Sequence, residues 1–199
     1  MARAALWARL VELLLVAWRR YEAALARAPL RTKAATGAAV MALSDCVAQA
    51  LQRRRRRQRG EDAAAAPWNA ARTASLALLG LLWSGPSVHL WQDWLARAVF
   101  PGQPATLALA CKKAVCDQAF YGPASNVVLM VYVSCVVNGE PLGEALGASL
   151  RRLPAVQLRA LRFWPLVSLS SYTLVAPDKR ALYANVASLL WSTYLNLQL

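Results

Sequence analysis

One stretch decides the fold of this chain, Lys112-Lys113-Ala114-Val115-Cys116-Asp117-Gln118-Ala119-Phe120-Tyr121-Gly122-Pro123. It opens with two lysines and leads into a run that is almost free of charge over residues 114–137. A helix needs about 20 apolar residues to cross a bilayer, so this run predicts a membrane span.

Two polar residues, Asp117 and Gln118, lie one turn inside that predicted span. A carboxylate at membrane depth costs about 2.5–3.5 kcal/mol on insertion scales, so such a residue normally faces a protein interior or a water-filled cavity. Alternatively, Asp117 lies near the interface and pairs with Lys113, four residues earlier on the same helix face. Both interpretations hold if the pair lines the mouth of a cavity.

Composition predicts an all-α fold, a polytopic membrane helical bundle. The chain has 199 residues, 58% of them hydrophobic, and a mean hydropathy of +0.32. A soluble all-helical domain is the alternative, but it would carry polar stripes that residues 73–91 and 181–199 lack. We expect four spans, at residues 34–51, 73–95, 114–137 and 163–176.

Two parts of the chain are expected to differ in their relation to the membrane. Residues 1–33 form a basic segment that predicts an amphipathic helix in the interface, with Trp7, Trp18 and Tyr21 at headgroup depth. A cleaved signal peptide and an Arg-rich mitochondrial presequence are the alternatives. Residues 34–199 form the membrane-embedded helical domain, and hydropathy leaves open whether its C-terminal apolar helix, residues 181–199, crosses the bilayer. Residues 138–153 predict a loose amphipathic connector.

The net charge of +13 raises the possibility of nucleic-acid binding. However, the basic residues are spread among loops and helix ends, and the aromatic residues lie in apolar runs and not beside the arginines. We therefore expect no nucleic-acid partner. Contact with anionic lipid headgroups explains the charge more simply.

Catalytic, metal and cofactor chemistry is not indicated. The four cysteines have no CxxC spacing and lie in or beside apolar helices, which suggests free thiols. The single histidine, His89, excludes a multi-histidine metal site, and no GxSxG, GxGxxG or Walker motif occurs. We expect no enzyme activity, no metal and no cofactor.

Several further polar residues lie in or beside the predicted spans. Asp45 and Gln49 are four residues apart and share one helix face, as do His89 and Asp93. For His89 the alternative is a hydrogen-bonded packing residue. The candidate pore-lining or interhelical polar residues are Asp45, Gln49, His89, Asp93, Lys113, Asp117, Gln118, Arg180 and Asn185. Helix kinks are expected at Pro86, Pro123 and Pro165.

Seven short patterns occur in order along nearly the whole chain. They are Trp18-x2-Tyr21-x3-Leu25-x3-Pro29, Pro29-Leu30-Arg31-Thr32-Lys33-Ala34, Ser44-Asp45 with Gln49, Gly85-Pro86-x2-His89-x-Trp91, Lys112-Lys113-x3-Asp117-Gln118-x4-Pro123, Trp164-Pro165, and Arg180-x4-Asn185-x5-Trp191-x2-Tyr194-Leu195. In these patterns the chain resembles the family of Mpv-seventeen and the peroxisomal membrane protein of twenty-two kilodaltons. The family signature is strongest in residues 136–197.

The chain departs from that family in places. Ser168, Ser171 and Tyr172 stand where the family has glutamine, asparagine and phenylalanine, and Gln92 follows Trp91 where the family has tyrosine. Residues 29–49 and 154–158 look most like the plant-type peroxisomal members. The resemblance therefore favours the peroxisomal membrane over the mitochondrial inner membrane.

The resemblance implies a four-span protein whose better-studied relatives behave as small channels. The first hypothesis is therefore a non-selective channel for small metabolites or ions, involved in organelle homeostasis. Two buried acids, Asp45 and Asp117, would bias such a pore toward cations. The alternative is a non-conducting structural or interaction protein in which the polar residues join helices. Membrane lipids and small metabolites or ions are the expected partners, and a homo-oligomer is compatible with either hypothesis.

Overall fold

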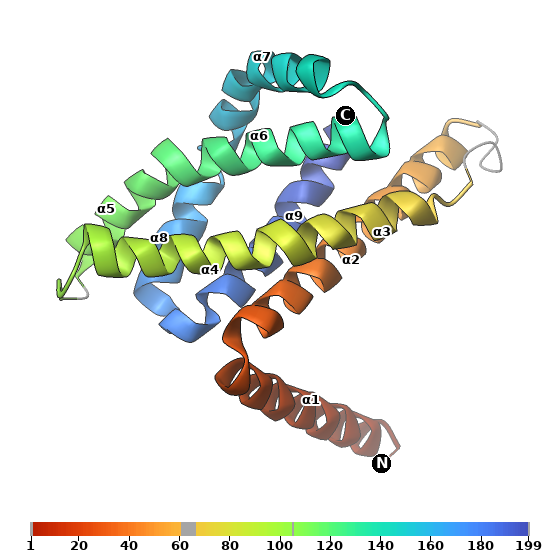
Figure 1. Ribbon diagram of the computed structural model, residues 1–199. Helices are drawn as coiled ribbons and strands as arrows, with labels where there is room; N and C mark the ends of the chain where they lie inside the picture. Colours follow the sequence, from red (N-terminus) through yellow and green to blue (C-terminus); the bar gives the residue numbers. More distant parts are fainter. Residues whose placement is uncertain (1, 61–66, 105, 199) are drawn as a thin grey trace.

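The computed structural model describes residues 2–60, 67–104 and 106–198, and these are helical with short connections. Figure 1 shows a bundle from which the first helix projects. That helix is α1 (Ala2–Arg27), which is followed by α2 (Pro29–Gln58). The chain turns at Ala28, whose φ of −146° is outside the helical range, and Pro29 lies in the first turn of α2, where a proline is tolerated. This confirms the all-α prediction.

Two long helices of the bundle are built on the same plan. Each consists of an α-helix, a wide π turn, a second α-helix and a second π turn. The first comprises α3 (Ala70–Leu79), η2 (Gly80–Ser84), α4 (Gly85–Trp94) and η3 (Leu95–Val99). The second comprises α5 (Leu107–Cys116), η4 (Asp117–Tyr121), α6 (Gly122–Tyr132) and η5 (Val133–Val137).

The Gly-Pro pairs explain the position of the first wide turn in each long helix, η2 and η4. Pro86 and Pro123 have no backbone N–H, so neither can donate the usual helical hydrogen bond. Directly before them, Gly85 N–H bonds to Gly80 O and Gly122 N–H bonds to Asp117 O, each five residues back. The chain therefore remains helical through both expected kinks, with one widened turn in front of each proline.

The remaining helices close the bundle. They are α7 (Leu142–Ala160), α8 (Trp164–Leu174), the single 3₁₀ turn η6 (Pro177–Lys179) and α9 (Arg180–Gln198). Helix α9 packs along α2, α8 packs against α5, and α7 covers α6 (Figure 1). Pro165 lies in the first turn of α8, so it begins a helix where a kink was expected.

Most of residues 138–153 form a regular helix, so the prediction of a loose connector is wrong for them. Helix α7 buries Ala145, Ser149 and Ala160 and leaves leucines and arginines exposed. Its apolar and basic residues occupy different sides, which is typical of a helix that packs on one face. Leu142, Leu146 and Leu150 are four residues apart, which is a helical spacing. The glycines in the same segment led to the prediction of a connector instead.

Two helical stretches in the described part of the chain are long and apolar enough to cross a membrane, namely Pro29–Gln58 and Leu107–Val137. They contain the spans expected at residues 34–51 and 114–137. In the second stretch the side chains of Val115, Phe120 and Val136 are exposed, as expected for a surface that faces lipid. The four-span arrangement stays a prediction.

Glycines let α2 approach the first long helix at backbone distance. Gly37 of α2 lies against Gly80 and Gly85, and all three are buried. A Cβ atom added to Gly37 would lie 2.6 Å from Gly80 O and 2.9 Å from the Gly85 nitrogen. Small residues permit this close packing in membrane helices.

Gly37→Ala is expected to lower the free energy of unfolding by about 1–3 kcal/mol, because the methyl group meets backbone atoms that cannot rotate away. Thermal and denaturant unfolding in detergent would measure the loss. Gly143→Ala is the matched control, since a Cβ there meets nothing within 4 Å. Equal stability of the two variants would contradict the close contact.

One cluster of side chains joins α1 to η6. Lys179 Nζ lies 2.8 Å from Glu22 Oε1 and 5.0 Å from the centre of the Trp18 ring. Leu25, one turn further along α1, is buried. The bond to Lys179 lowers the pKa of the Glu22 carboxyl, and the same bond raises the pKa of the Lys179 ammonium.

The contact of α1 should therefore depend on pH at both extremes. It is present above the ordinary pKa of a glutamate and is lost as pH falls through the lowered pKa of Glu22. It is equally present below the ordinary pKa of a lysine and is lost as pH rises through the raised pKa of Lys179. Hydrogen exchange of the backbone amides of residues 18–27, corrected for the intrinsic exchange rate, should show a loss of protection both at low and at high pH.

Lys179→Gln should abolish that pH dependence, and the double exchange Glu22→Lys with Lys179→Glu should restore protection at neutral pH. Unchanged exchange in Lys179→Gln at every pH would show that the ion pair does not hold α1.

Candidate functional site

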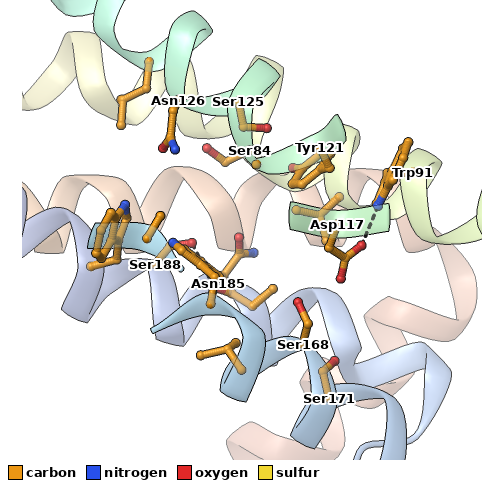
Figure 2. Close-up of a pocket in the computed structure, with 18 of the residues that line it drawn as sticks. Ser84, Trp91, Asp117, Tyr121, Ser125, Asn126, Ser168, Ser171, Asn185 and Ser188 are labelled. Carbon is orange, nitrogen blue, oxygen red and sulfur yellow. Dashed lines mark hydrogen bonds between the residues drawn. The ribbon is translucent and has the colours of Figure 1, made fainter. Parts of the chain in front are cut away.

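A cavity of about 140 Å³ lies inside the bundle. Its walls come from the first long helix, the second long helix, α8 and α9, with Met41 of α2 at one side (Figure 2). A cavity of about 150 Å³ holds one benzene molecule, so this one has room for a compact molecule of about six non-hydrogen atoms.

The cavity wall mixes aromatic and polar side chains. Aromatic rings come from every wall, at Trp83, Trp91, Tyr121, Trp164, Tyr172 and Trp191. Hydroxyl groups and carboxamides lie between them, and the labelled side chains in Figure 2 point toward one another across the space. Among the described residues, the only ionisable acid or base on this wall is Asp117.

Asp117 is positioned by the wide turn in front of Pro123, since it is the first residue of η4. Its Oδ1 accepts a hydrogen bond from Trp91 Nε1 at 2.7 Å, drawn in Figure 2, and another from the Tyr172 hydroxyl at 3.0 Å. The cations of Arg180 and Lys113 lie 5.2 Å and 5.7 Å from the centre of the Tyr172 ring. The carboxylate is thus held by neutral hydrogen-bond donors. The two cations lie near the ring of one of these donors, Tyr172.

No direct ion pair joins Asp117 to Lys113 within the described part of the chain, so the pairing considered from the sequence is replaced by the bonds to Trp91 and Tyr172. Arg180 donates from Nε to Val175 O at 3.1 Å and to Ser171 O at 3.3 Å. It therefore satisfies carbonyl groups at the C-terminus of α8.

The far side of the cavity is tied to α7. Asn126 Nδ2 donates to Gln157 Oε1 at 3.1 Å, and Gln157 Nε2 donates to the backbone oxygen of Gln118 at 3.2 Å.

Sequence reasoning did not select Asn126, although a carboxamide four residues after Gly122 in an uncharged run is a usable signal. It also did not select the cavity-lining aromatic residues Trp83, Trp91, Tyr172 and Trp191.

A second polar centre lies away from the cavity, between α2 and α3. Asp45 is fully buried, and its Oδ1 lies 2.8 Å from Arg72 Nε. Its Oδ2 accepts from the Thr73 hydroxyl and from Gln49 Nε2, both at 2.6 Å. Gln49 Oε1 in turn accepts from the backbone N–H of Asn69 at 2.9 Å. This network joins α2 to the start of α3.

Of the nine candidate polar residues, the structure brings Asp117, Gln118 and Asn185 to the cavity. Asp45 and Gln49 form the separate network. His89 accepts a hydrogen bond at Nδ1 from the buried Lys33 Nζ at 3.0 Å, which joins α4 to α2. Asp93 forms an exposed ion pair with Arg97 at 2.8 Å.

The fold is a helical bundle with two helical stretches that are long and apolar enough to cross a membrane, and with a small, mostly apolar chamber whose wall carries several polar groups. Residues 135–196 match the Mpv17 / PMP22 family. This match, together with the relatives described next, confirms the resemblance seen in the sequence patterns. No solved structure matches the chain.

Three relatives illustrate the range of that family. The mitochondrial inner membrane protein Mpv17 of Rattus norvegicus is 28% identical over 179 residues, which are 90% of this chain and 95% of the relative. The peroxisomal membrane protein PMP22 of Arabidopsis thaliana is 28% identical over 182 residues, 90% of this chain and 87% of the relative. PXMP2/4 family protein 2 of Dictyostelium discoideum is 25% identical over 179 residues, 90% of this chain and 89% of the relative.

Arg72→Met should lower the free energy of unfolding by about 3–5 kcal/mol, because it leaves the buried Asp45 carboxylate without its cation. The double variant Asp45→Asn, Arg72→Met should recover much of the loss. Arg97→Met is the control: its pair with Asp93 is exposed, so the loss should stay below about 1 kcal/mol. Chemical unfolding in detergent measures all three, and similar losses for Arg72→Met and Arg97→Met would disprove the buried pair's role.

Proposed function

We propose that the protein is a small channel of an organelle membrane, which lets small metabolites or ions pass through the cavity. The observation that carries this proposal is a chamber between apolar helices, whose mostly apolar wall also carries Asp117 and several hydroxyl and carboxamide groups. Irregular backbone at membrane depth is tolerated where it is buried in protein or lines a cavity, and the π turns η2 and η4 both lie at this wall.

The chamber contains one acid where the sequence suggested two. Asp45 pairs with Arg72 and does not line the cavity. Any preference of the chamber for cations must therefore come from Asp117 alone. A single carboxylate with two neutral donors tunes the passage of ions more weakly than a ring of charges.

Asp117→Asn should change the single-channel conductance or the ion preference of the purified protein in planar bilayers, because Asp117 is the only carboxylate that the described residues place on the cavity wall. Trp91 and Tyr172 can still donate to the remaining carboxamide oxygen, so the fold should persist. We expect a change of about two-fold or more in the permeability ratio of cation to anion.

Asp93→Asn is the matched control, since it removes the same charge from an exposed ion pair outside the cavity. Identical conductance and ion preference in both variants and the parent protein would refute the passage through this chamber. A silent bilayer with folded protein would refute ion conduction through the chamber.

The second candidate is a non-conducting structural or interaction protein, and the Asp45 network favours it. That network uses a buried acid, a buried carboxamide and Arg72 only to join helices. If the chamber plays the same part, its polar residues are packing residues. Asp117→Asn should then lower thermal stability while conductance stays at the background of protein-free bilayers.

For the membrane itself we propose the peroxisomal membrane, with the mitochondrial inner membrane as the alternative. Support comes from the plant-type pattern of residues 29–49 and 154–158, and relatives from both organelles match the chain. Membrane lipids are the proposed partners of the exposed apolar faces, and a homo-oligomer through these faces is compatible with a channel.

A further inference from the structure

Six polar atoms of residues on the cavity wall have no hydrogen-bond partner in the part of the chain that the structure describes. They are Trp83 Nε1, Gln118 Oε1, Ser125 Oγ, Ser171 Oγ, Asn185 Nδ2 and Trp191 Nε1. Ser171, Asn185 and Trp191 are 4%, 2% and 7% exposed. Because buried polar groups nearly always find a partner, these atoms mark positions for the polar atoms of an occupant.

The six atoms come from several walls instead of gathering on one side. Trp83 comes from η2, Gln118 from η4, Ser125 from α6, Ser171 from α8, and Asn185 and Trp191 from α9. Figure 2 shows Ser171 and Asn185 among the side chains that face the interior from different walls. One molecule in the cavity would therefore be met from several directions.

The type of each atom limits the chemistry of the occupant. Three of them, on Trp83, Asn185 and Trp191, are N–H donors and require acceptor oxygens. Gln118 Oε1 is an acceptor and requires a donor, and the hydroxyls of Ser125 and Ser171 serve as either. An occupant therefore needs more than one oxygen atom and at least one O–H group.

Charge excludes ions as the preferred occupant. An anion would lie beside the Asp117 carboxylate in a site of low dielectric constant. A cation would face three N–H donors, and Asp117 Oδ1 is already bonded to Trp91 and Tyr172. The aromatic rings on every wall offer apolar faces to C–H groups.

Resting on the proposed function, we infer that the chamber binds a compact, uncharged polyhydroxyl molecule of about six non-hydrogen atoms. Its oxygens accept from the indole N–H groups of Trp83 and Trp191 and from Asn185. One of its hydroxyls donates to Gln118. Passage through the chamber is then selective for such solutes over ions of the same size.

The test uses the full chain in lipid nanodiscs, labelled with nitrogen-15 at the indole positions. Glycerol is the probe, with glycerate as an anion and 2-amino-1,3-propanediol as a cation of similar size. Glycerol should shift the indole signals of Trp83 and Trp191 to saturation, and the two ions should not. The signals of Trp7 and Trp94, which are 67% and 52% exposed, are internal controls.

Variants assign the binding to the named donors. Trp191→Phe keeps a ring against Phe163 and removes the N–H, and Asn185→Leu removes the amide at similar size. Each should weaken glycerol binding about five-fold, read on the Trp83 signal, because one hydrogen bond is lost. Trp94→Phe, outside the cavity, should leave binding unchanged.

Equal, non-saturating shifts of all indole signals, or unchanged binding in both cavity variants, would overturn the inference. Glycerol flux into proteoliposomes, measured by light scattering, separates it from the proposed function. Saturable shifts without flux would uphold the binding site and refute the channel. Flux without saturable shifts would uphold a channel and refute the binding site.

Discussion

The absence of a backbone N–H at Pro86 and Pro123 is the constraint on which the rest of the bundle depends. Each proline follows a glycine inside a long helix, and each forces a five-residue turn in front of it. In the first helix that turn places Gly80 and Gly85 against Gly37 of α2. In the second helix the corresponding turn begins at Asp117, so one backbone feature sets both the tightest helix contact and the position of the acid.

Helix packing and chamber formation are therefore linked. The glycines bring α2 and the first long helix together until their backbones touch, so side chains such as Trp83 and Trp91 extend toward α6, α8 and α9. Trp91 stacks on Tyr121 and donates to Asp117, so it joins the first long helix to the second at the cavity wall. Close backbone packing on one side and aromatic contacts on the other therefore flank the chamber.

The sequence predicted the helical class, and the structure places three of the candidate polar residues, Asp117, Gln118 and Asn185, on the cavity wall. A polar residue in an apolar run has few places to go other than the protein interior. It did not predict the partner of Asp45, because Arg72 lies after the loop that joins α2 and α3 and approaches only when both helices pack. Nor did it predict that Pro165 begins a helix, since that depends on where α7 ends.

Asp45, which is buried, and Asp117, which lines the cavity, are held in two different ways in this protein. Asp45 is neutralised by Arg72 and by donors from Thr73 and Gln49, so nothing remains for a ligand. Asp117 is held by an indole and a phenol, while the cations of Lys113 and Arg180 stay behind the Tyr172 ring. A full ion pair at Asp117 would place a long cationic side chain in the chamber. Neutral donors keep the acid bonded and leave the chamber space open, which is what a cavity that admits solutes requires.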